Sequence, residues 1–239
     1  MFENLKSALN AELEACKEST QFYIINGYFP TWSENNRRHA DDGLRRYSTP
    51  AKWDAYQAGT LTRADAVKIA TRRAFRDIQK TYAVKLEKLD QISSAPELEF
   101  VTINLEWIRN RTFGNNPRVD ALTNESKVYT GTASGCSHDK ASTAIAEALN
   151  SSPAVLKMLY TAAEKAMAEG QRPDRINDAT VTWRNILGYG SGYSILPYFE
   201  GGVGVSCFET IFNRCGYTFR QVANSKRYDV YNVAKSEVK

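Results

Sequence analysis

The chain has few of the residues that build metal centres or disulfide frameworks. Its 239 residues include only four cysteines and two histidines, and no two cysteines form a CxxC pair. This scarcity excludes a zinc finger and a disulfide scaffold. No apolar run approaches the ~18 residues that a membrane helix requires. The first twenty residues mix charged and apolar side chains, unlike a signal peptide. We therefore expect a cytoplasmic protein with reduced cysteines and no membrane partner.

The remaining composition is that of an ordinary globular protein. The chain has 31 Lys+Arg, 27 Asp+Glu, a net charge of +4 and 42% hydrophobic residues, so it has enough apolar surface for one large or two small domains. The sequence shows no recognisable pattern of paired catalytic carboxylates, of a Ser/His/Asp set or of a metal-ligand cluster. We assign no catalytic residue, no metal ligand and no cofactor, and the sequence favours a non-catalytic protein without deciding the question.

Residues 1–95 predict a helical, basic N-terminal region. Leu5, Leu9 and Leu13 form one apolar stripe of a helix over residues 2–19, as the helical period requires. The clearest helix covers residues 62–89, where Thr62 is a candidate N-cap and Asp65 stands in the capping-box position. This helix carries basic residues at every fourth position, opposite its apolar face.

These basic residues are the first candidate site. A row of cations on a helix neutralises phosphates and steers nucleic acid, although it is also typical of an ordinary solvated helix face. The candidate nucleic-acid-binding residues are Arg37, Arg38, Arg45, Arg46, Lys68, Arg72, Arg73, Arg76 and Lys80.

Residues 96–239 predict an α+β domain. After Pro96 the apolar period changes from 3.6 to 2, which indicates strands at 101–107, 118–123 and 127–133, with a turn at Asn115–Pro117. Helices are expected at 140–150, 153–169 and 205–215, and a closing hairpin at 217–233. The predicted fold is therefore an N-terminal helical region followed by an antiparallel sheet, a three-strand meander plus the C-terminal hairpin, covered by helices on one face.

A glycine-led turn precedes the helix predicted at residue 140. Free N–H groups at such a helix start favour an anion, and the candidate ligand-binding residues are Gly135, Ser137, His138 and Lys140. The alternative is structural: Gly135 sets the turn and Ser137 or Asp139 caps the helix. Cys136 is a further alternative, as a nucleophile activated by the helix end and His138.

A second glycine-rich stretch covers residues 188–204 and opens the helix predicted at 205. Its tyrosines offer stacking surfaces for bases, and its closing glycines offer a phosphate cradle. The candidate residues are Tyr189, Tyr193, Glu200, Gly201 and Gly202. The structural alternative is an ordered loop whose aromatic residues pack against the sheet.

Two segments resemble a family of uncharacterised proteins encoded by phages, prophages and other mobile elements of Gram-positive bacteria. They read YTGTASGCSHDKASTAIAEALN (residues 129–150) and GYGSGYSILPYFEGGVGV (residues 188–205). The resemblance covers about the C-terminal 140 residues. It implies a mobile-element context, in the cytoplasm of a host cell, and carries no catalytic assignment.

Three functions follow as hypotheses. The first is a non-catalytic accessory protein that binds nucleic acid or a host nucleoprotein such as a CRISPR effector, in the manner of an anti-defence protein. The second is a module that binds or processes a nucleotide or another small phosphorylated ligand. The third is a virion or structural protein.

Overall fold

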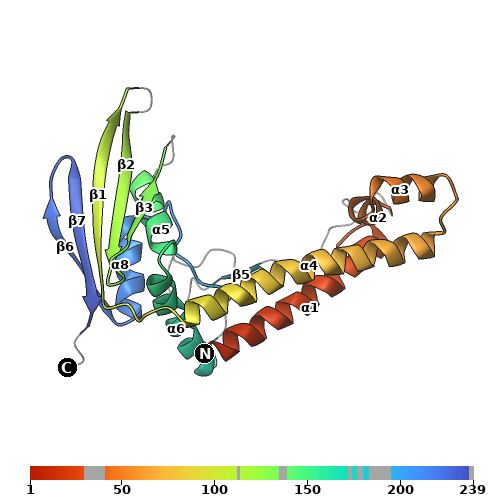
Figure 1. The fold of residues 1–239 in the computed structure, drawn as a ribbon, viewed down its shortest axis with the longest axis horizontal. Helices are drawn as coiled ribbons and strands as arrows, with labels where there is room; N and C mark the ends of the chain where they lie inside the picture. The colour runs from red at the N-terminus through yellow and green to blue at the C-terminus, as the bar shows by residue number, and fades with distance from the viewer. Residues whose placement is uncertain are drawn as a thin grey trace. The chain divides into compact units, whose positions relative to one another are not determined.

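The computed structural model describes residues 1–29, 41–111, 114–134, 139–171 and 195–236, together with the backbone of residues 174–176 and 180–182. The chain forms two compact units, both visible in Figure 1. Residues 6–88 make up a helical unit. Residues 1–5 and 89–239 make up a sheet unit.

Two long helices form the body of the helical unit. They are α1 (Glu3–Asn26) and α4 (Arg63–Ser93), and the unit includes all but the first three residues of α1 and the last five of α4. Lys85 Nζ lies 3.8 Å from a Glu12 carboxylate oxygen, and near the other end the Arg63 guanidinium donates to the Ile25 carbonyl at 2.7 Å. The two helices therefore run antiparallel, as Figure 1 shows.

Two short helices, α2 (Asp42–Tyr47) and α3 (Pro50–Gln57), complete the helical unit. The sequence pattern predicts no helix there. Leu44 of α2 is fully buried in a cluster with Ile24 of α1 and three alanines of α4, Ala66, Ala70 and Ala74. Contacts with residues distant in the sequence thus bury the apolar side chain of a helix too short to be stable alone.

The boundaries of the two long helices follow local chemistry. The prediction that the first helix ends at residue 19 is wrong, because the buried side chains of Thr20, Tyr23 and Ile24 continue its apolar stripe. It ends before Gly27, which has φ +76° and donates to the Tyr23 carbonyl. The predicted N-cap of α4 is confirmed, because the Asp65 N–H donates to the Thr62 hydroxyl at 3.2 Å, and that hydroxyl donates to the Asp65 carboxylate at 2.7 Å.

A five-stranded antiparallel sheet dominates the sheet unit. It contains β1 (Phe100–Asn110), β2 (Gly114–Thr123), β3 (Val128–Thr132), β6 (Tyr217–Asn224) and β7 (Tyr228–Lys235) in the order β3-β2-β1-β7-β6. The meander and the C-terminal hairpin meet where β1 pairs with β7, with Val101 opposite Val233 and Ile103 opposite Tyr231. The predicted α+β fold is confirmed. A separate two-stranded sheet pairs β4 (Asp174–Ile176) with β5 (Thr180–Thr182).

Helices cover one face of the five-stranded sheet (Figure 1). They are α5 (Lys140–Asn150), α6 (Pro153–Ala168) and α8 (Val205–Arg214). Alternate residues of β1, among them Val101, Ile103 and Leu105, are buried, while their neighbours on the other face are more exposed. Ser152 caps α6 with Pro153 at its first position, as predicted, and its hydroxyl accepts from the Val155 N–H.

The predicted turn at Asn115–Pro117 is wrong, because these residues lie inside β2. Pro117 is buried opposite Trp107 of β1. The Trp107 N–H points the other way and donates to the Arg227 carbonyl at 2.8 Å. Trp107 and Pro117 therefore form a pair without hydrogen bonds between them, and the N–H that proline lacks is not needed on that side.

Gly131 of β3 permits the close approach of α5 to the sheet. A Cβ atom on Gly131 would lie 1.8 Å from the Ala144 carbonyl oxygen. We predict that Gly131→Ala lowers the free energy of unfolding by about 2 kcal/mol, because a backbone must shift to make room. Urea denaturation measures this loss.

The neighbouring variant Thr132→Ala is the control. Thr132 is exposed, so its replacement should cost less than about 1 kcal/mol. Equal losses in the two variants would contradict the packing of α5 on β3.

Candidate nucleic-acid interface

One face of α4 carries the basic row that the sequence singled out. At 3.6 residues per turn, Lys68, Arg72, Arg76 and Lys80 fall, with Arg73, within an arc of about 140°. The buried side chains of α4, among them Ala70, Ala74 and Tyr82, lie on the opposite side of the helix. The row from Lys68 to Lys80 spans about 18 Å along the helix axis.

All five cations of this face are exposed. Within the part of the chain that the structure describes, none of them forms an ion pair. Asp65 stands on the same face, where its carboxylate accepts from the capping Thr62 hydroxyl, and Asp77 lies about 40° beyond the arc. Five cations against one carboxylate give this face a net positive charge that is exposed to solvent.

Other predicted residues of this site lie nearby in the sequence. Arg45 and Arg46 are exposed on α2, a helix that packs on α1 and α4 through Leu44. Arg37 and Arg38 lie outside the described residues. Arg63 was not among the predicted site residues and forms an ion pair within the helical unit. Its Nε lies 3.5 Å from the Asp41 carboxylate, and that carboxylate also accepts from the Tyr56 hydroxyl at 3.0 Å.

The excess positive charge of the chain belongs to the helical unit. That unit has 15 Lys+Arg and 10 Asp+Glu, a net charge of +5, whereas the sheet unit has 16 and 17, a net charge of −1. Within α4 alone, eight cations stand against four carboxylates. Positive charge gathered on one part of a molecule attracts polyanions over several ångströms at low salt.

The second candidate site lies in the sheet unit, at the start of α5. Asp139 caps this helix, since its carboxylate accepts from the Ser142 N–H at 3.2 Å. Gly201 and Gly202 lie against the same turn: the Ser142 hydroxyl accepts from the Gly202 N–H at 2.5 Å and from the Val203 N–H at 3.2 Å. The structure thus brings the starts of α5 and α8 together. Side chains accept hydrogen bonds from three backbone N–H groups there, those of Ser142, Gly202 and Val203.

The other residues predicted for this site fall into two groups. Lys140 is half-buried at the first position of α5, and Glu200 is half-buried beside Phe199. Asn150 fixes this segment, because its side-chain amide both donates to and accepts from the Phe199 backbone at 2.8 Å. Gly135, Ser137, His138, Tyr189 and Tyr193 lie outside the described residues, as does Cys136. Their role stays a prediction.

In the described ranges, no helix has both the length and the apolar character needed to cross a bilayer. The same ranges contain no group of three or more His, Cys, Asp or Glu side chains placed to hold a metal ion.

No protein-family model, curated protein or solved structure matches this chain. The resemblance to mobile-element proteins therefore stays an expectation from the sequence.

Ser142 is the residue on which the glycine-led turn at 201–203 depends. Its side chain is fully buried and accepts from two backbone N–H groups. Ser142→Ala removes this acceptor, and we predict a loss of about 1–3 kcal/mol in the free energy of unfolding. Urea denaturation followed by circular dichroism measures it.

Ser151→Ala is the matched control at the other end of α5. The Ser151 hydroxyl is exposed and donates only to the Glu147 carbonyl, so this change should be nearly neutral. If Ser142→Ala lowers the free energy of unfolding no more than the control does, Ser142 does not hold the turn. The Gly202 and Val203 N–H groups are then available to a ligand.

Proposed function

We propose that this protein is a non-catalytic nucleic-acid-binding protein that uses the basic face of α4 as its contact surface. The observation that carries the proposal is the row Lys68, Arg72, Arg76 and Lys80, exposed and without an ion pair among the described residues. Such a row suits the regularly spaced phosphates of a nucleic-acid backbone.

The proposal concerns backbone contact rather than sequence reading. Lysine and arginine side chains that touch phosphates position a protein on nucleic acid, and base-edge contacts are what specify a sequence. At about 18 Å, the row matches roughly five base pairs of duplex at 3.4 Å each. We therefore expect modest affinity, little sequence preference and strong dependence on salt.

The same surface would serve against free nucleic acid or against nucleic acid held in a host nucleoprotein. The resemblance to mobile-element proteins is the reason to include a nucleoprotein such as a CRISPR effector among the partners tested. The charge balance of the helical unit supports both forms of the proposal equally.

Reversal of three charges on α4 tests the proposal. We predict that the triple variant Arg72→Glu, Arg76→Glu, Lys80→Glu loses at least about tenfold in affinity for a 20-base-pair DNA duplex, because each lost phosphate contact removes a salt-dependent increment of binding. Fluorescence anisotropy at low salt measures the affinity. Single-stranded DNA and RNA of the same length, as separate arms, identify the preferred polymer.

A variant with the same change in net charge separates a local effect from a global one. Lys127→Glu, Arg220→Glu, Lys226→Glu reverses three exposed charges of the sheet unit and should bind nearly as the unmodified protein does. Both variants should keep their melting temperature, since exposed charges contribute about 1 kcal/mol or less each. Equal binding by the two triple variants would show that the α4 face is not the contact surface.

A further inference from the structure

The sheet unit contains a cavity of about 760 Å³ that none of the sequence motifs indicated. One wall is a face of α6 that includes Met158, Ala162 and Lys165, spaced four and three residues apart, with Lys157 beside them. The other walls come from the end of α8 and the start of β6, and from the chain before β1. The volume falls within the ~300–1,000 Å³ of small-molecule sites.

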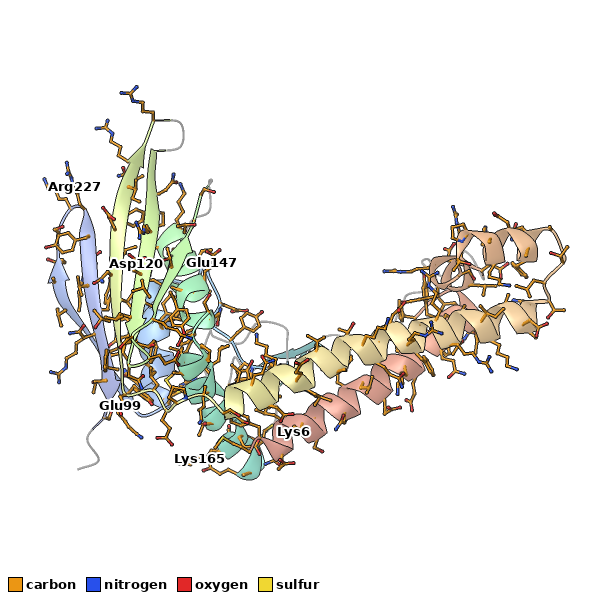
Figure 2. All side chains as sticks on the ribbon, in the orientation of Figure 1. Lys6, Glu99, Asp120, Glu147, Lys165 and Arg227 are labelled. Carbon is orange, nitrogen blue, oxygen red and sulfur yellow. The ribbon has the colours of Figure 1, made fainter. Side chains whose placement is uncertain are left out.

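Cations outnumber carboxylates in the walls of this cavity. Lys157, Lys165, Arg214 and Lys235 line it, against Glu97 and Glu169. Lys235 and Glu97 partly offset each other, with Nζ 3.2 Å from the carboxylate. Lys157 donates one of its three N–H bonds to the Ala95 carbonyl. Lys165 is exposed on α6, where Figure 2 labels it.

The remaining wall is apolar or electrically neutral. Met158, Ala162 and Leu98 contribute hydrophobic surface. The Tyr217 hydroxyl donates to the Leu98 carbonyl at 2.6 Å, and burial raises the pKa of this phenol to about 12. Burial likewise raises the pKa of the Cys215 thiol to about 12. Both groups therefore stay protonated at neutral pH and add no negative charge to the cavity.

We infer that this cavity binds a small organic anion, with a carboxylate or phosphate held by Lys165 and an apolar body against Met158 and Ala162. A cation at the rim and apolar side chains in the wall form an amphipathic site that suits a ligand of the same character. An ammonium group forms charge-assisted hydrogen bonds with either kind of head group.

The methionines of the chain offer a direct readout. Met158 and Met1 line the cavity, whereas Met167 does not. In the full-length protein labelled with ¹³C at the methionine methyl groups, titration with 1-naphthyl phosphate should shift the Met158 signal saturably and leave Met167 in place. 1-Naphthoate tests the carboxylate, inorganic phosphate tests the head group alone, and naphthalene-1-methanol tests the neutral body.

A charge reversal in the wall tests the role of the cations. Lys165→Glu should weaken the binding of 1-naphthyl phosphate about tenfold or more, since a hydrogen bond to a charged group is lost and a repulsive charge is gained. Lys127→Glu, an exposed lysine outside the cavity, makes the same change in net charge and should leave the affinity unchanged.

A saturable Met158 shift with the anions, weakened only by Lys165→Glu, supports the inference, and the stronger of the two naphthyl anions identifies the head group. No Met158 shift up to millimolar probe overturns it, as does equal binding of the neutral alcohol or equal weakening by the two lysine variants. Nucleic-acid binding through α4 stands or falls independently of these results.

Discussion

The pairing of β1 with β7 is the constraint on which the sheet unit depends. It joins residues 100–106 to residues 228–234, which are separated by more than half the chain. With this register fixed, the meander and the C-terminal hairpin become one sheet with a continuous buried face, which α5, α6 and α8 cover. The cavity lies at the end of the same pairing, because Glu97 and Leu98 before β1 and Lys235 at the end of β7 form part of its wall. Long-range strand pairing of this kind loses substantial chain entropy and is compensated by the apolar surface it buries.

The helical unit follows a different principle. Its two long helices turn small and apolar side chains inward and leave the cations of α4 outward. Within its interior, Glu12 lies near Lys85, whose ammonium stands 4.2 Å above the Tyr82 ring. Burial and the nearby Glu12 carboxylate raise the pKa of the Tyr82 phenol. Glu12, Lys85 and Tyr82 thus interact with one another between the two helices, whereas the cations on the outer face of α4 are exposed to solvent.

Much of this fold could be predicted from local chemistry. Thr62 with Asp65, Ser152 with Pro153, and the period-2 alternation of Val101, Ile103 and Leu105 each specify an element from neighbouring residues alone. The short helix α2 could not be predicted, because Leu44 gains its burial from Ile24 and from alanines more than twenty residues later. Pro117 suggests a turn from the sequence, because only the strand register shows that its missing N–H removes no hydrogen bond to β1. The basic face of α4 can be recognised in the sequence because all its cations belong to one helix. The cavity cannot be recognised there, because its cations come from three separate elements, α6, α8 and β7.

The central claim is that α4 contacts a nucleic-acid backbone through its charges, and the salt dependence of binding tests it most directly. The association constant of the unmodified protein for a short DNA duplex should be measured over a series of salt concentrations. If the four cations of the row each neutralise one phosphate, the logarithm of this constant should fall linearly with the logarithm of salt concentration, with a slope of about −3.6. A slope near zero, or no binding even at low salt, would contradict the account.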